Sequence, residues 1–359
     1  MITGENMDTV LVKFAGINTE FTVSKILDLG FTEVRWYGAI IAFGFLLAVL
    51  LGGRIAHMWK VNLDKMIDIL LFGTVGGIVG ARAYYVAFEW EYYSQHLSEI
   101  YKIWEGGLAI YGGIIGGILA AFVVCKAEKI NFYNLLDMGG ISLLVGQGIG
   151  RWGNYANQEA FGGFTYKNFG MMSDTVASYI QRPDVAVQYG LENVENIPQY
   201  IADNNLYVHP TFFYESVWCL LGVLVLYTVM KKYRKFSGEM FLIYGLWYGL
   251  ERAVVEGLRS DSLYIGNTGL RVSQVLSILI VAVCGTLLIL KLIKYSKTPR
   301  EVEGTDYIAI SNDKEYNRIT KALNKRAARK NWRFEYNRVG DKLYVTATTD
   351  KGIVTNKII

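Results

Sequence analysis

The sequence is poor in charged residues and in cysteine. Only 19% of its 359 residues are charged and 52% are hydrophobic, which is too apolar for an ordinary soluble domain. The cysteines Cys125, Cys219 and Cys284 lie inside or at the end of apolar runs, without metal-ligand spacing. An odd, scattered set argues against a disulfide framework, so we interpret them as small apolar packing residues. This composition favours a multi-span membrane protein with soluble parts.

Two sequence patterns are also missing. The N-terminus has no basic region followed by a long apolar core, so we expect no cleaved signal peptide and a first span that itself directs insertion. No Gly-x-Ser-x-Gly motif is present, and the cysteines offer no activated nucleophile. If the protein catalyses a reaction, the nucleophile should therefore belong to a substrate.

Seven apolar segments are present, and each is near the ~20 residues that a helix needs to cross a bilayer. The sequence therefore predicts an all-α polytopic membrane protein with seven transmembrane helices. The spans are expected at about 36–56, 66–88, 106–125, 135–150, 211–230, 240–258 and 272–293. Residues 1–35 are predicted to form an external N-terminal arm, with a short hairpin or an interfacial segment. Residues 36–295 form the core, with an external insertion at 151–210.

Basic residues occur in alternate loops. They follow the first span (Arg54, Lys60, Lys65), the third (Lys126, Lys129), the fifth (Lys231–Lys235) and the seventh (Lys291, Lys294, Lys297, Arg300). The segment Glu89–Glu105 instead carries four glutamates and one lysine. Because positive loops stay inside, the N-terminus is predicted outside and the C-terminus in the cytoplasm, which requires an odd number of spans.

The last part of the chain, 305–359, has a different character. Asp313–Lys330 has a charged helical pattern, and Trp332–Arg338 and Lys342–Thr348 resemble strands joined at Gly340–Asp341. We expect a small cytoplasmic α/β appendage. Its basic helix could contact nucleic acid or anionic lipid, but a solvated helix face is the favoured interpretation, and no nucleic-acid partner is expected.

The most informative stretch is GQGIGRWGNYANQEAFGG, residues 146–163. It places Arg151, Asn154, Asn157 and Glu159 within nine residues, at the predicted outer end of the fourth span. An arginine at such a place is suited to binding an anion such as a phosphate. The alternative is an interfacial arginine that extends into lipid headgroups.

Other polar residues are predicted at the same membrane level. Tyr37 and Tyr111 open the first and third spans from outside, and His209 precedes the fifth. In the sixth span, helical geometry places four residues on one stripe, at about 0°, 40°, 80° and 20°: Tyr248, Arg252, Glu256 and Arg259. An internal Arg252–Glu256 pair would explain two of these residues. The whole set predicts a polar cavity open to the outer leaflet, where more than one arginine binds a lipid phosphate.

These motifs resemble the prolipoprotein diacylglyceryl transferase family. GRWGNYANQEAFGG is similar to that family's signature segment, and HPTFFYE, YGLERAVVEGLRSDS and GGLAIYGGIIGG resemble three further segments in the right order. The resemblance covers about residues 30–295. It implies transfer of a diacylglyceryl group from phosphatidylglycerol to the lipobox cysteine of a preprolipoprotein, in the bacterial cytoplasmic (inner) membrane. It implies no metal and no cofactor, and both substrates would enter from the membrane lipid.

The resemblance also implies roles for individual residues. Arg151 and Arg252 would bind the phosphate and stabilise its departure, with Tyr111 as a third catalytic residue. The remaining candidates would bind substrate: Tyr37, Asn154, Asn157, Glu159, Gly162, His209, Tyr248, Glu256 and Arg259. Many family members have histidine at the position of Tyr111, and neutral tyrosine is a poor base at pH 7. Tyr111, His209, Glu256 and the phosphate all remain candidates for the proton acceptor.

Two other functions compete with the transferase. A transporter or scavenger that only binds an anionic lipid would need the same cavity. An intramembrane protease would need a Ser/His or paired-Asp site, and the sequence has none convincingly placed.

Overall fold

The computed structural model describes residues 9–297 and 307–348, apart from 18, 29, 31, 60, 166–168, 261, 263, 267, 331 and 332. The chain divides into two compact units, Met1–Leu288 and Ile289–Ile359. Lys60, Asp261 and Trp332 lie outside the described residues, as do residues 298–306.

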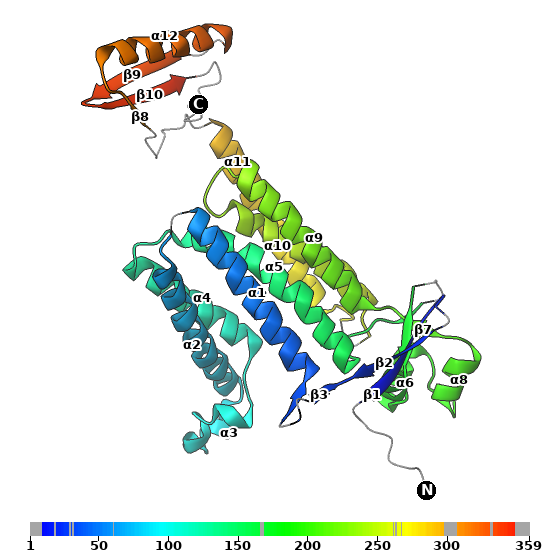
Figure 1. Cartoon of the computed structure of the whole chain (residues 1–359). Helices are drawn as coiled ribbons and strands as arrows, with labels where there is room; N and C mark the ends of the chain where they lie inside the picture. Colours follow the sequence, from blue (N-terminus) through cyan, green and yellow to red (C-terminus); the bar gives the residue numbers. More distant parts are fainter. Residues whose placement is uncertain are drawn as a thin grey trace. The chain divides into compact units, whose positions relative to one another are not determined.

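Each of the seven predicted spans is a helix (Figure 1). They are α1 (Trp36–Met58), α2 (Leu63–Phe88), α4 (Ile110–Ala127), α5 (Phe132–Asn157), α9 (Thr211–Lys232), α10 (Glu239–Leu258) and α11 (Val272–Lys297). Within the described residues, five helices are long and apolar enough to cross a membrane, judged by length and composition: α1, α2, α4, α9 and α11. The chain is therefore mostly helical, as a polytopic membrane protein is.

Helix α5 is longer than the sequence predicts. Asn131 caps its start by accepting a hydrogen bond from the Tyr133 amide at 2.9 Å. The helix ends at Asn157 and is followed by Gln158, whose φ of 57° is left-handed. The expectation that this helix stops near Gly150 is wrong, because its glycines are packing sites. An added Cβ at Gly148 or Gly150 would come within 3.2 Å of a side chain on a neighbouring helix. Arg151, Asn154 and Asn157 therefore lie on a rigid helix.

Four helices pack around one apolar core. α5 lies between α1 and α9, and α10 packs against α5 and α9 (Figure 1). The most buried side chains of this cluster include Ile55, Met138, Leu144, Leu226 and Met240. Close packing of such side chains is sensitive to single methylene changes, so it fixes the rotation of each helix about its axis.

Helices α2 and α4 form a separate pair with glycines along their contact. An added Cβ at Gly116 would lie 2.2 Å from the Gly76 carbonyl oxygen, and one at Gly112 would lie 2.3 Å from that of Gly80. These glycines bring the two helices into close contact. Glycine permits this approach because it has no side chain to separate the backbones.

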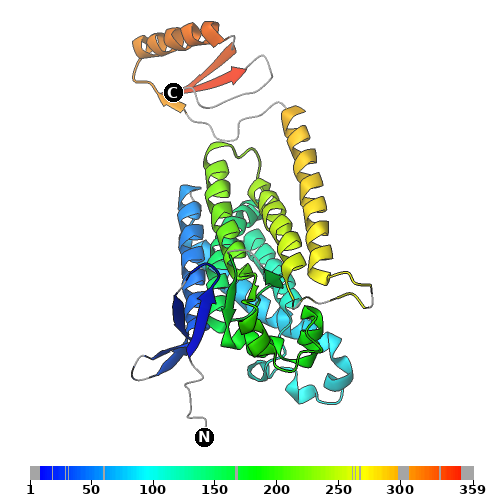
Figure 2. The same cartoon turned by 90° about the vertical axis from the view of Figure 1, so that its right-hand side faces the viewer.

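A small sheet is built from two distant parts of the chain. β1 (Thr9–Phe14) pairs with β2 (Glu20–Ser24), which confirms the predicted hairpin, and also with β6 (Met171–Ser173). The strand order is β2-β1-β6-β7-β5, with β5 at Phe164–Thr165 and β7 at Tyr207–Val208. The predicted arm and insertion thus form one body, beside the first turn of α1 and the last turn of α5 (Figure 2).

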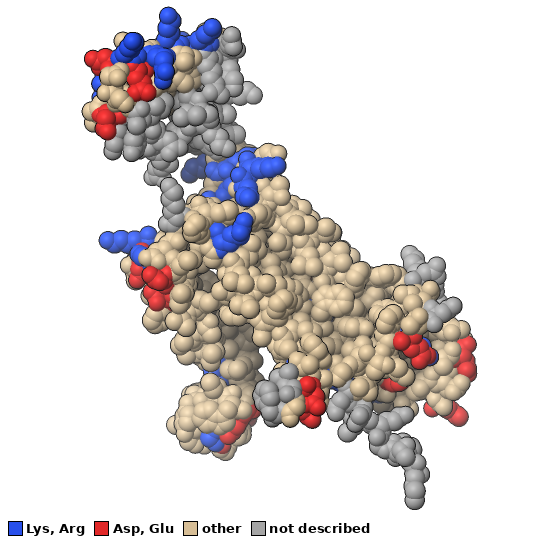
Figure 3. Space-filling view, viewed as in Figure 1, with Lys and Arg blue, Asp and Glu red and all other residues tan. Residues whose placement is uncertain are grey.

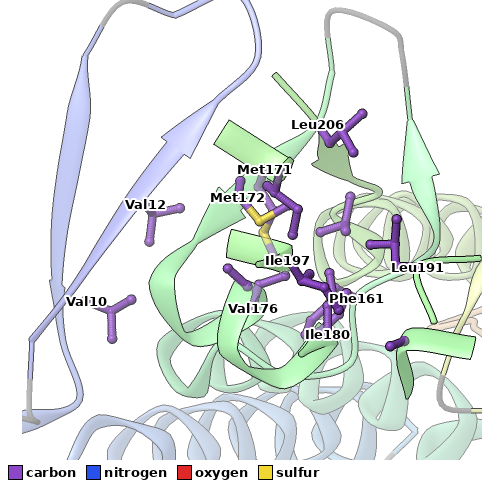
Figure 4. Packing of buried hydrophobic residues seen from close by; sticks show 14 of the residues in the cluster. Val10, Val12, Phe161, Met171, Met172, Val176, Ile180, Leu191, Ile197 and Leu206 are labelled. Atoms are coloured by element: carbon purple, nitrogen blue, oxygen red, sulfur yellow. The ribbon is translucent and has the colours of Figure 1, made fainter. Parts of the chain in front are cut away.

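This sheet has its own hydrophobic core (Figure 4). Val12, Met171, Val176 and Ile180 are fully buried in it, and Phe161 joins them from the segment after α5. The short helices that cover the sheet are α6 (Asp174–Ile180), α7 (Pro183–Ala186), η3 (Val187–Tyr189) and α8 (Ile197–Asp203). Because it has its own core, this body can hold the residues that follow α5 in fixed positions.

A second two-stranded ribbon, β3 (Ile26–Asp28) with β4 (Glu33–Arg35), leads into α1. Between α2 and α4 come α3 (Trp90–Tyr93), η1 (Leu97–Glu99) and η2 (Ile103–Glu105). Buried Arg82 holds this segment, donating to the backbone carbonyls of Glu99, Ile100, Gly106 and Gly107 at 2.6–3.0 Å. The hydrogen bond from Tyr92, together with that from Lys102, lowers the pKa of Glu99.

The other end of the bundle carries the basic loops. Lys and Arg side chains gather where α9 ends and α10 begins (Figure 3), and Lys231, Lys232 and Lys235 are exposed there. Within this loop, Arg234 turns inward and donates to the buried Asp137 at 2.8 and 3.0 Å. Asp137 also accepts the amides of Gly238 and Phe241, so it ties the loop to α5.

The last unit contains β8 (Tyr307–Ala309), α12 (Asp313–Lys330), β9 (Arg333–Val339) and β10 (Lys342–Thr348). Its antiparallel sheet has the order β8-β10-β9. Leu323 of α12 is buried with Phe334, Tyr336 and Val345.

Candidate active site

The central feature is an ion-pair network that joins three helices. Arg151 of α5 pairs with Glu215 of α9, and Arg252 Nη1 of α10 lies 3.2 Å from Glu215 Oε1. Arg252 Nη2 also pairs with Glu256 Oε2 at 2.6 Å, one turn further along α10. The internal pair of Arg252 with Glu256, which was the alternative interpretation of these two residues, is therefore present. We refer to Arg151, Glu215, Arg252 and Glu256 as the arginine–carboxylate network.

Its members differ in exposure. The side chains of Glu215 and Glu256 are 1% and 2% exposed, whereas those of Arg151 and Arg252 are 18% and 17% exposed. Each guanidinium carries five N–H donors, and the ion pairs use only part of them. The two arginines therefore combine anchored positions with accessible donors, which is what binding of an oxyanion requires. As two cations and two anions, the four ionised residues together are neutral.

The polar groups continue along α10. The rings of Tyr248 and Tyr244 stack with centroids 6.0 Å apart, and the Gln147 amide on α5 donates to the Tyr244 hydroxyl at 3.1 Å. Tyr248 and Arg252 fall on the predicted stripe together with Glu256, because residues four apart share one face of a helix. This polar face turns toward α5 and α9, where partners are available.

A second cluster follows directly on α5. The side-chain amides of Asn154 and Asn157 both donate to Glu159 Oε1, at 3.0 and 3.4 Å. Asn157 and Glu159 also line a cavity of 290 Å³, together with residues of the insertion such as Tyr179. Three of the predicted site residues are thus brought together, held by hydrogen bonds to one carboxylate.

Gly162 lies where three segments meet. Its amide donates to the His209 carbonyl at 2.9 Å, and the next amide, of Gly163, donates to the Leu258 carbonyl at 2.8 Å. An added Cβ at Gly162 would come within 2.8 Å of the Leu258 oxygen and 2.9 Å of His209 Cβ. Glycine is required here because this close approach leaves no room for a side chain. Arg259, which bridges Gly162 through its backbone, is held at the end of α10 by this junction.

Three further predicted site residues, Tyr37, His209 and Tyr111, lie outside the two clusters described above. The ring of Tyr37 packs on Gly153, where an added Cβ would be 3.0 Å from Cδ2, so Tyr37 adjoins the α5 segment of the site. His209 Nδ1 and the Tyr214 hydroxyl lie 3.2 Å apart. Tyr111 lies in the first turn of α4, is 48% exposed, and within the described residues has no hydrogen bond to the arginine–carboxylate network.

Two carboxylates were not among the predicted site residues. Glu215 is the residue that joins the two arginines, and Glu251, which precedes Arg252, is 5% exposed. Both residues could have been found from the sequence, because an acidic residue inside a membrane span is costly and therefore marks a buried polar site. The stripe on α10 excludes Glu251, because it lies about 60° from Tyr248 on the side away from Arg252.

Comparisons with known proteins show the family of this chain. A protein-family model described as "Prolipoprotein diacylglyceryl transferase" matches residues 24–290. The chain belongs to the prolipoprotein diacylglyceryl transferase family. It is 38% identical over 285 residues to the phosphatidylglycerol–prolipoprotein diacylglyceryl transferases of Staphylococcus aureus strains Newman, USA300 and JH9. These alignments cover 78% of this chain and 93% of each relative.

The family match includes all twelve predicted site residues and both additional carboxylates. It ends at residue 290, so β8, α12, β9 and β10 lie beyond it. The family match therefore covers the active-site candidates but not these four elements.

Proposed function

We propose that this protein transfers the diacylglyceryl group of phosphatidylglycerol to the lipobox cysteine thiol of preprolipoproteins. The observation that carries this proposal is the Arg151–Glu215–Arg252 bridge between α5, α9 and α10. It holds one guanidinium group at each oxygen of one carboxylate, so an incoming phosphate with the same charge and bidentate geometry can bind both. The relatives, which are named as transferases with these substrates, support the same reaction.

The two arginines can assist the reaction through the negative charge that develops on the leaving group. The thiol sulfur attacks the glyceryl carbon, a C–S thioether bond forms, and the C–O bond to phosphate breaks. Glycerol phosphate leaves and gains negative charge as it does so. Arg151 and Arg252 stabilise that charge more strongly in the transition state than in the bound lipid, which is how such groups accelerate a reaction. The acceptor of the thiol proton stays open between Tyr111, His209, Glu256 and the phosphate.

The other residues would shape the headgroup site. Asn154, Asn157 and Glu159 present amide and carboxylate groups suited to the hydroxyls of a glycerol headgroup. Gly162 and its junction fix His209 and Arg259 beside them. Tyr37 and Tyr248 close the site with aromatic surface, and Tyr111 would donate a hydrogen bond to the phosphate.

We further propose seven spans in the bacterial cytoplasmic membrane, with the N-terminus outside and the C-terminus in the cytoplasm. α5 and α10 would also span, since their polar residues pair inside the bundle and not with lipid. The exposed lysines after α9 support a cytoplasmic position for that loop. The units would then be an external arm at 1–35, a core at 36–295 with an external insertion that follows α5 at 158–210, and a cytoplasmic α/β appendage at 305–359.

The test is a mass spectrum of a lipobox peptide after incubation with the protein and phosphatidylglycerol. We expect the mass to rise by one diacylglyceryl unit, with release of glycerol phosphate. A peptide whose lipobox cysteine is replaced by serine is the control and should stay unmodified. Lipid binding without any thioether product would instead indicate the lipid-binding transporter, an alternative that the comparisons do not support.

A further inference from the structure

Glu251 is a buried acid that the proposed mechanism does not use. It lies in the middle of α10 and is 5% exposed. Neither of its carboxylate oxygens has a hydrogen-bond partner among the residues that the structure describes. By comparison, Glu239 on the same helix is equally buried but accepts the backbone amide of Lys235. An unpartnered buried acid on a helix next to the site calls for a physical explanation.

The groups around Glu251 come from three helices. Glu215 and Arg151, on α9 and α5, and its neighbour Arg252 act on it electrostatically. The Cys219 thiol of α9 and the Tyr248 hydroxyl of α10 also interact electrostatically with Glu251. α11 packs against this helix at Gly249 through Ser277 and Val281, and at Gly245 through Cys284. A charge on Glu251 would therefore act on both arginines of the network.

The charges in this region constrain its protonation. The arginine–carboxylate network is neutral as two cations and two anions. An ionised Glu251 would make the group net negative, and that would oppose the approach of an anionic lipid phosphate. An isolated carboxylate without a partner is also very costly to bury, and such a group keeps its proton instead.

We propose that Glu251 is held as a neutral carboxylic acid and acts as a positioning residue for Arg151 and Arg252. By staying uncharged it leaves both guanidinium groups available to one lipid phosphate. This inference rests on the proposed function, because it assumes that the two arginines bind the phosphate of phosphatidylglycerol.

Infrared spectroscopy of the full chain tests the protonation state directly. The protein is placed in phosphatidylcholine nanodiscs, and the difference between alkaline and neutral spectra is recorded. We expect loss of a protonated carboxylic-acid C=O band in the wild type and in the control Glu239→Gln, and no such loss in Glu251→Gln. A Glu251→Gln spectrum identical to that of the wild type would overturn the proposal. This measurement does not require enzyme activity. Its result therefore remains interpretable even if the protein proves not to be a transferase.

Kinetics test the consequence for lipid binding. We expect KM for phosphatidylglycerol to rise with pH in the wild type, because ionised Glu251 repels the phosphate, and to rise less in Glu251→Gln. Glu251→Leu, which cannot ionise either, should show the same flattened pH profile of KM as Glu251→Gln. Identical pH profiles of KM for the wild type and Glu251→Gln would refute the role while leaving the transferase activity intact.

Discussion

Replacing Arg252 by alanine should remove two contacts at once. The guanidinium bridges Glu215 at 3.2 Å and Glu256 at 2.6 Å, and both carboxylates are almost fully buried. Loss of one partner of a buried pair costs about 3–5 kcal/mol of stability, because the remaining charge is uncompensated. If Arg252 also stabilises the departing phosphate, kcat should fall by about 10²–10³-fold, as for removal of one oxyanion donor.

A double variant separates these two effects. In Arg252→Ala/Glu256→Gln the stranded carboxylate is replaced by a neutral amide, so most of the lost stability should return. Turnover should stay low, because the phosphate has still lost one guanidinium group. Thermal unfolding in detergent and mass spectrometry of a lipobox peptide measure the two quantities on the same preparations.

A matched control comes from an exposed pair. Arg182 lies 2.9 Å from Asp184, and its side chain is 57% exposed, so Arg182→Ala should cost no more than about 1 kcal/mol. Wild-type turnover in the double variant would refute the reasoning, since Arg252 would then serve only to neutralise Glu256. If Arg252→Ala alone is as stable as the wild type, the estimated cost of about 3–5 kcal/mol for breaking the buried pair is refuted.

Three further substitutions test the packing and the site. Gly116→Ala should destabilise the α2–α4 pair by about 1–3 kcal/mol in an unfolding assay, because its methyl group would meet a backbone oxygen 2.2 Å away. Gly139→Ala, with no atom within 4 Å, should change stability by less than about 1 kcal/mol, and an equal loss in both would argue against the contact. Gly162→Ala should lower kcat/KM by about 10²-fold, because displacing the junction by about 1 Å misplaces site residues, and unaltered kinetics would contradict this. Tyr111→Phe should lower kcat/KM about 10- to 100-fold if its hydroxyl donates to the phosphate, and an unchanged rate would show that only the ring matters.

Much of the helical core could be predicted from the sequence, because a bilayer imposes a length and an apolar composition on each span. The predicted fifth span even begins at the residue observed, Thr211, and the helix Asp313–Lys330 was predicted with its observed bounds. The fourth helix was predicted seven residues too short at its end. Glycines are poor helix formers in general, and only the close packing on Tyr37 and Cys219 explains why they are tolerated there.

The sequence by itself determined which polar residues are expensive in a membrane, and so it indicated Arg151, Arg252 and Glu256. It also supplied the ordered motifs that place the chain in its family. Only the tertiary structure decided that Glu215 joins the two arginines, that Glu251 is buried without a partner, and that the N-terminal hairpin completes the sheet of the insertion. The physical reason is that periodicity along one helix fixes which face a residue occupies, whereas the partner of a buried charge depends on which helices lie opposite that face.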